Sequence, residues 1–239
     1  MKDFYTMKRI RYIWLLMVLL MTSSCGELFE FEELEGNSLS GVQLSYDAVD
    51  IMVGDSVFFQ AEVQPAGAGV SYTWNLKGDT TVYDWKGYWL HAVRQGHVDV
   101  YVEAANVDSL GDLEAVVKDT CAVNIFEWID YEYPDDFLYE TVVYASLQVN
   151  GEEVKDSLGS IQVVAIADDR VRCHAKMDTA YGVSYLTFRI GSFWPGETAR
   201  IQCYLPEQYK RFDLGEIVLD GSTKGTLSNL VKFECGFNN

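Results

Sequence analysis

Basic residues and histidines are scarce in this chain of 239 residues. It has 18 lysines and arginines against 36 aspartates and glutamates, a net charge of −18, and three histidines. Phosphate groups are bound by clusters of basic side chains, so this balance argues against nucleic acid and anionic lipid as partners. It favours solubility and leaves neutral glycans, proteins or cations as candidate ligands.

Residue patterns of common enzymes are also missing. His91, His97 and His174 have no metal-binding spacing, and there is no H-E-x-x-H motif, G-x-S-x-G elbow or glycine-rich phosphate loop. Cys173 and His174 are neighbours in an expected strand, where adjacent side chains point to opposite faces. Carboxylate pairs like those of glycosidases arise by chance in a chain with so many acids. The sequence therefore predicts a protein that is not an enzyme.

The apolar run at the N-terminus is short. It spans the ten residues 12–21, whereas a helix that crosses a membrane needs roughly 20. Four basic residues precede the run, and Thr22-Ser23-Ser24 follows it. Basic, apolar and small residues in this order predict a signal peptide over residues 1–24.

Cys25 comes directly after this segment. Its position resembles the lipobox of bacterial lipoproteins in the loose form of Bacteroidetes, with Thr22 in place of the usual aliphatic residue. The resemblance implies that Cys25 becomes the first residue of the mature chain and carries acyl chains such as palmitate, which anchor the protein to the outer membrane. The alternative is an ordinary signal peptide that contains a cysteine.

The residues after Cys25 are strongly acidic. Residues 27–36 resemble the acidic stretch that marks surface-exported lipoproteins of Bacteroidetes, and this implies display on the cell surface. A flexible, solvated tether over residues 25–40 is a compatible interpretation. The first 24 residues hold four basic side chains and one acid, so the chain from Cys25 onward has a net charge of −21.

From Val42 onward, short runs of alternating apolar and polar residues are separated by turn residues. This texture predicts an all-β protein with a β-sandwich over 41–125, a packed linker over 126–138 and a second sandwich over 139–239. No segment has a convincing helical period. The expected strands are 42–46, 56–63, 70–76, 98–104 and 115–125, followed by 141–149, 160–167, 170–177, 184–190, 199–205, 216–219 and 230–237.

The first domain resembles PKD-type and bacterial group 2 Ig-like modules. The resemblance rests on Val53-Gly54-Asp55, Phe58-Phe59-Gln60-Ala61 and Tyr72-Thr73-Trp74, together with the glycine-led run 96–102. It covers about residues 40–125 and implies an Ig-like sandwich with Trp74 packed between its sheets. With the second sandwich predicted from the strand pattern, we expect two consecutive Ig-like β-sandwich domains.

Four further cysteines occupy alternating apolar positions of expected strands, so each is expected to face a core. The exported compartment permits disulfides, and any bond is expected among the last three of the set Cys121, Cys173, Cys203 and Cys235. There is no C-x-x-C, which argues against zinc.

No cofactor is expected. Calcium is the ion that loop carboxylates would suit best, and the candidate pairs are Asp79 with Asp84, Asp108 with Asp112, and Asp135 with Asp136. The alternative is that these acids are simply solvated turn residues.

One cluster of aromatic residues lies at positions 83–89. Strand alternation would place Tyr83, Trp85 and Trp89 on one face and Tyr88 on the other. Trp194, in a Phe-Trp-Pro-Gly loop, is a second candidate. Exposed aromatic rings stack on sugars or on protein partners, but these rings could also close the sandwich or a domain interface.

Together these patterns predict a non-enzymatic, membrane-anchored lipoprotein of the cell envelope that acts as an extracellular binding or spacer module. The alternative is a glycan-binding accessory lipoprotein that uses the exposed aromatic residues Trp85, Trp89 and Trp194.

Overall fold

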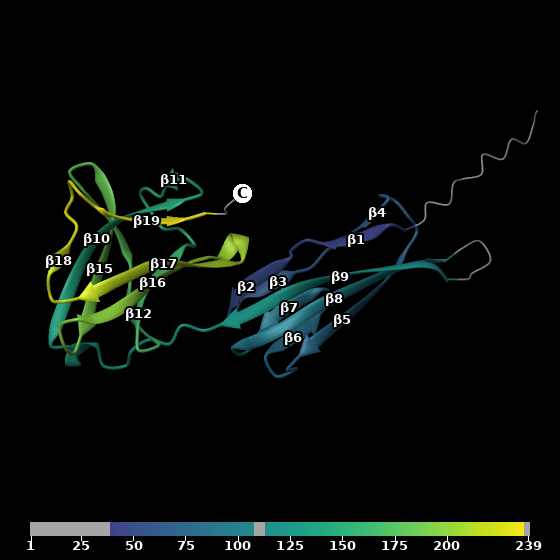
Figure 1. Cartoon of the computed structure of the whole chain (residues 1–239), viewed down its shortest axis with the longest axis horizontal. Coiled ribbons are helices and arrows are strands. Elements are labelled where there is room, and N and C mark those ends of the chain that lie inside the picture. The colour runs from purple at the N-terminus through teal and green to yellow at the C-terminus, as the bar shows by residue number, and fades with distance from the viewer. Residues whose placement is uncertain (1–38, 108–112, 237–239) are drawn as a thin grey trace, which may run out of the picture.

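A computed structural model describes residues 39–107 and 113–236. The described chain is all-β, as predicted, and its strands form two lobes that follow one another along the chain (Figure 1). Two short 3-10 turns, η1 (Pro134–Asp136) and η2 (Pro206–Gln208), are the helical elements of this part. None of the described residues belong to a helix that is long and apolar enough to cross a membrane.

The first lobe is a β-sandwich of two main sheets. One has the strand order β2-β9-β8-β5 and the other β3-β7-β6, while β1 and β4 pair separately. Apolar side chains such as Ile51, Val57, Leu90 and Val100 are fully buried between them. The strands are β1 (Gly41–Leu44), β2 (Ala48–Met52), β3 (Ser56–Phe58), β4 (Ala61–Gln64), β5 (Ser71–Gly78), β6 (Tyr83–Lys86), β7 (Trp89–Ala92), β8 (Gly96–Val107) and β9 (Leu113–Phe126).

The second lobe is another β-sandwich. One sheet has the order β13-β12-β16-β17; in the other, β10 pairs with β11, β15, β18 and β19. Its core includes Phe188, Ile201 and Leu219. The strands are β10 (Tyr139–Val149), β11 (Glu152–Glu153), β12 (Gln162–Ala167), β13 (Arg170–His174), β14 (Lys176–Ala180), β15 (Val183–Ser192), β16 (Glu197–Leu205), β17 (Lys210–Leu219), β18 (Thr223–Lys224) and β19 (Val231–Cys235).

The β16–β17 hairpin of the second lobe joins the two lobes. The amide of Asp50 in the edge strand β2 donates to the carbonyl of Tyr209 at 2.8 Å, and Lys210 Nζ donates to the carbonyl of Ala48 at 2.8 Å. The Tyr209 ring meets Tyr46 edge-on, with 5.4 Å between ring centroids. The hairpin thus covers backbone groups that the first sandwich would otherwise leave at its edge.

Alternation along an expected strand would place Cys173 on the same face as Val171, and this is wrong. The pairing of β12 with β13 shifts register, so that Cys173 lies opposite Ala165 and Val171 opposite Ile166. Arg172 is the extra residue of this β-bulge. Cys173 therefore packs half-buried against the core of the second lobe, whereas Val171 packs on the other side of the sheet.

Candidate functional site

A groove of about 450 Å³ opens at one side of the first sandwich. There the edge strands of the two sheets, β3 and β5, do not pair with each other. The lining is mainly aromatic, with two polar side chains along one wall: Phe58, Phe59, Gln60, Ala61, Glu62, Tyr72, Trp74 and Tyr88. Its volume lies within the roughly 300–1,000 Å³ of typical small-ligand sites.

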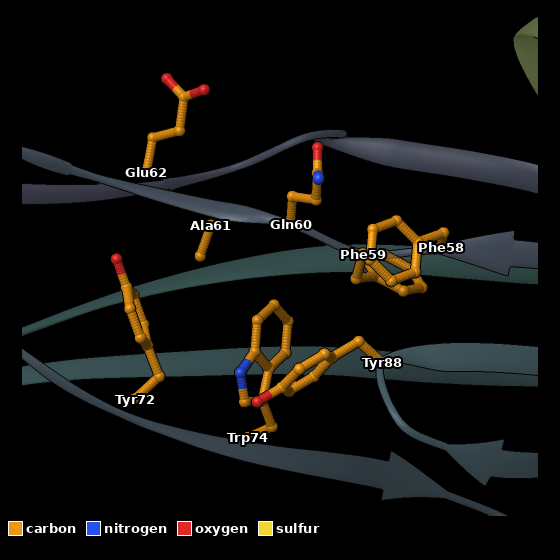
Figure 2. A pocket seen from close by; sticks show the side chains of 8 residues that line it. All are labelled: Phe58, Phe59, Gln60, Ala61, Glu62, Tyr72, Trp74 and Tyr88. Atoms are coloured by element: carbon orange, nitrogen blue, oxygen red, sulfur yellow. The ribbon is translucent and has the colours of Figure 1, made fainter.

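Trp74 stands at the centre of the groove wall. Figure 2 shows its indole ring between Tyr72 on one side and Tyr88 on the other. The ring centroids of Trp74 and Tyr88 are 5.4 Å apart, and those of Trp74 and Trp85 are 6.0 Å apart. The inner side of Trp74 thus rests on the core, and its outer side faces the groove. The expectation that Trp74 is packed between the sheets holds only for its inner side, because β5 is an edge strand.

Tyr88 reaches the groove from the β6–β7 turn. Lys86 pairs with Trp89, so Gly87 and Tyr88 form a two-residue turn, and both have positive φ, 56° and 70°. The Tyr88 carbonyl accepts a 3.0 Å hydrogen bond from the Phe59 amide, which fastens the turn to the end of β3. Tyr88 and Tyr72 are 49% and 39% exposed, so both rings are accessible to a ligand.

The turn at Gly87-Tyr88 makes the predicted alternation of the aromatic cluster wrong at Trp89. Tyr83 and Trp85 pack against the core of the first lobe, as does Leu90, the partner of Trp85. Trp89 points to the opposite face, because the two turn residues interrupt the alternation. It is 49% exposed, and its ring lies 5.0 Å from that of Phe58 at the rim of the groove.

Trp194 lies in the other lobe, 58% exposed and packed on Phe193. Near it, the Arg172 guanidinium is enclosed by the rings of Tyr131, Phe137 and Phe193, with centroids 4.7, 4.7 and 5.2 Å from Cζ. An aromatic enclosure of this kind can bind a cationic ligand. Here the protein's own arginine occupies it.

Sequence reasoning missed Phe58, Phe59 and Tyr72 as site residues. Tyr72 lies in an expected strand, but the structure divides the expected strand 56–63 into β3 and β4 with a break at Phe59-Gln60. The groove depends on that break and on how the strands are arranged. Phe58 ends β3, Phe59 follows it directly, and Tyr72 is near the start of β5. A consecutive aromatic pair cannot face one side of a strand, so Phe58-Phe59 was a signal that one ring points outward.

The described residues contain no group of three or more His, Cys, Asp or Glu side chains placed to hold a metal ion. Asp79 accepts the amide of Thr81 at 2.8 Å, and this hydrogen bond lowers the pKa of its carboxyl group. Asp84 lies on β6, and Asp135 and Asp136 belong to η1. Cys25, Asp108 and Asp112 lie outside the described residues.

No protein-family model matches the chain, and no curated protein sequence matches it. Solved structures with a similar outline include SGBP-B of the Bacteroides ovatus mixed-linkage glucan utilization locus, in complex with a mixed-linkage heptasaccharide. It is 12% identical with a TM-score of 0.22, and the match covers 77% of this chain and 44% of that one. Domains 5-6 of the S-layer protein SbsC are 11% identical, with a TM-score of 0.27 and coverage of 79% and 99%. The tandem Ig repeats of Dlar are 12% identical, with a TM-score of 0.21 and coverage of 82% and 99%. These TM-scores are too low to establish a common fold, so the assignment as an all-β protein of two sandwiches rests on the strands themselves.

Proposed function

We propose that this chain is a non-enzymatic lipoprotein, tethered through Cys25 to the outer membrane at the cell surface, that binds neutral glycan chains in the aromatic groove of its first sandwich. The observation that carries the proposal is the set of rings from Tyr72, Trp74 and Tyr88 around one open groove. Aromatic faces stack against the C–H faces of sugar rings, while nearby polar groups hydrogen-bond to hydroxyls.

Charge supports a neutral ligand. The groove is lined by one acid, Glu62, and by no basic side chain. The chain from Cys25 onward has a net charge of −21, so it repels acidic polysaccharides at long range. Along the polar wall, the exposed Gln60 amide can donate hydrogen bonds to sugar hydroxyls and accept them, and the exposed Glu62 carboxylate can accept them.

The arrangement of the lobes supports a role as a spacer as well. β1 begins at the outer end of the first lobe, and the second lobe lies at the opposite end (Figure 1). A tether joined to the start of β1 would therefore place the first sandwich nearer the membrane and the second farther from it. The hydrogen bonds of the β16–β17 hairpin stiffen the junction between them.

Binding is tested with the whole exported chain, extracted in detergent and applied to an array of neutral and acidic polysaccharides. We expect neutral glycans to bind, and the double variant Tyr72→Thr/Tyr88→Asn to lose that binding. Trp194→Ala is the matched control, because it removes an exposed aromatic ring from the other lobe. If Trp194→Ala loses binding and Tyr72→Thr/Tyr88→Asn keeps it, the glycan binds at the 193–196 loop and not in the groove.

The tether is tested separately with Cys25→Ser. A chain without the acylated cysteine is expected to leave the membrane fraction, because two or more acyl chains are what hold such a protein stably at a bilayer. Retention of Cys25→Ser in the membrane fraction would contradict the lipid anchor and leave the glycan result standing.

A further inference from the structure

Two buried cysteines of the second sandwich lie against each other. The Sγ atoms of Cys203 and Cys235 are 3.9 Å apart, in van der Waals and weak hydrogen-bond contact. Cys203 is completely buried and Cys235 is 2% exposed, both among apolar core side chains. They come from strands of different sheets, β16 and β19, so the contact crosses the sandwich from one sheet to the other.

The other two described cysteines do not take part in this contact. Cys121 is buried in the first lobe, where its thiol donates to the carbonyl of Ala122. Cys173 is half-buried beside a different surface, where its thiol donates to the carbonyl of His174 and accepts the amide of Arg189. Among the described residues, the geometry thus singles out one pair of the three that the sequence left open.

We propose that Cys203 and Cys235 form a disulfide in the exported protein and that this bond joins the two sheets of the second sandwich. The inference rests on the export proposed above, because disulfides form and persist in oxidising compartments. Closing the gap to the roughly 2.05 Å of an S–S bond needs a shift of about 2 Å, shared between two side chains.

The reaction is a two-electron oxidation. Both S–H bonds break and one S–S bond forms, and the two electrons and two protons pass to a protein disulfide of the envelope, which becomes a dithiol. The contact with Cys235 and burial raise the pKa of the Cys203 thiol, whereas the same contact lowers the pKa of Cys235. Both sulfurs are buried, so the oxidising protein reaches them while the chain folds, before β19 docks.

The bond would add a covalent link to a short strand that is otherwise held by its pairing with β10 and by the packing of Phe233 in the core. β19 is the last strand of the described residues, has five residues, and pairs with β10. Its cysteine lies 32 positions beyond Cys203 in the sequence. A cross-link over such a loop removes much of the freedom of the unfolded chain, and it would fasten the C-terminal strand to the opposite sheet.

The test uses the full chain with its own N-terminal segment, expressed in a Gram-negative host and recovered from the membrane fraction. The protein is denatured with an alkylating agent before any reductant is added, and its mass and peptides are measured. We expect Cys121 and Cys173 to be alkylated, and Cys203 and Cys235 to appear as one cross-linked peptide pair. Reductant should lower the unfolding midpoint of this protein by on the order of 10 °C. The double variant Cys203→Ala/Cys235→Ala should show no such shift, whereas Cys121→Ala should keep it.

Four alkylated thiols in protein that has reached the membrane would overturn the disulfide, and so would a cross-link between any other pair. If the chain stays in the cytoplasm, the proposed export fails instead. In that case the same chain, in which Cys25 is not acylated, is refolded in a glutathione redox buffer and decides the disulfide alone: a 203–235 cross-link supports it, and alkylation of all five thiols overturns it. Glycan binding is measured on the same samples and does not depend on the result.

Discussion

The hydroxyl of Tyr204 in the second lobe donates a 2.9 Å hydrogen bond to Asp55 Oδ2 in the first, across 149 positions of sequence. Tyr204 is fully buried, and its ring meets Phe126 edge-on with 5.0 Å between centroids. Burial and the bond to the Asp55 carboxylate raise the pKa of Tyr204. The hydroxyl therefore stays protonated and donates at any physiological pH.

Tyr204→Phe is expected to weaken the junction while leaving each sandwich folded. The variant loses one hydrogen bond to a charged group, which contributes about 1.5–3 kcal/mol. The half-buried Asp55 carboxylate can form a hydrogen bond with water instead, so we expect a loss of stability near the lower end of this range. Hydrogen exchange at the Asp50 amide, which donates to Tyr209 across the junction, would report the change. Tyr133→Phe, at a 61% exposed ring, is the control. If the Asp50 amide exchanges at the same rate in Tyr204→Phe and Tyr133→Phe, the hydrogen bond between Tyr204 and Asp55 does not stabilise the junction.

A buried ion pair joins Arg172 and Glu197 in the second lobe. Arg172 Nη2 lies 3.2 Å from Glu197 Oε1, and the two side chains are 2% and 6% exposed. The second oxygen of Glu197 accepts the amide of Phe193 at 3.2 Å, so this carboxylate also holds the loop that encloses the arginine.

Removing one member of the pair is expected to cost far more than removing both. Glu197→Leu leaves the guanidinium without its buried partner, and such losses are about 3–5 kcal/mol. The double variant Arg172→Leu/Glu197→Leu leaves no buried charge, so its free energy of unfolding should be higher than that of either single variant. Denaturant titration measures all three. If the double variant is less stable than both single variants, the contacts of Arg172 with the three aromatic rings contribute more to stability than the removal of the buried charges gains.

His97 is expected to titrate above the usual imidazole value of about 6.5. Hydrogen bonds from its ring to Asn124 Oδ1, at 2.9 Å, and to Asp99 Oδ1, at 3.0 Å, raise the pKa by favouring the doubly protonated ring, and burial opposes them. A pKa that is raised on folding contributes stability below the unfolded value, and this stability is lost as pH rises through the folded value. The side chain is 51% exposed, so the effect on stability is small. The ring titration, followed by NMR, should shift to lower pH in Asn124→Ala; an unchanged midpoint would contradict this assignment.

Much of the strand framework could be predicted from the sequence, because β8, β9, β15 and β16 are long and keep a regular alternation. The short strands β2, β6 and β7 were not predicted, since four or five residues give too little pattern. The bulge at Arg172 and the turn at Gly87-Tyr88 each shift side chains to the other face, and neither shift follows from counting residues in a strand. The resemblance to Ig-like modules implies a core position for Trp74, and the sequence does not show that its strand lies at a sheet edge, because edge strands cannot be told from central ones without the pairing.

The groove itself could not be predicted for the same reason. Its walls come from the end of β3, the start of β4, the first half of β5 and the turn between β6 and β7, and these segments meet only after the sheets have formed. Single aromatic residues could be proposed from sequence, but not the set that shares one surface. The alignment of Tyr72, Trp74 and Tyr88 is thus a property of the sandwich and not of a motif.

Tyr88→Asn separates ligand binding from folding. Residue 88 has a φ of 70°, a conformation that asparagine adopts more readily than tyrosine. We therefore expect the variant to be at least as stable as the natural chain while it loses one ring of the groove. A stacked ring contributes about 0.5–1.5 kcal/mol beyond the area it buries, so affinity for a bound glycan should fall by at least about two- to tenfold. Calorimetric titration measures the affinity, and thermal unfolding measures the stability.

Trp89→Ala tests the boundary of the site, because Trp89 contacts Phe58 at the rim without lining the groove. Its effect on affinity should be smaller than that of Tyr88→Asn; the reverse order would place the sugar on the outer face of β7 and not in the groove.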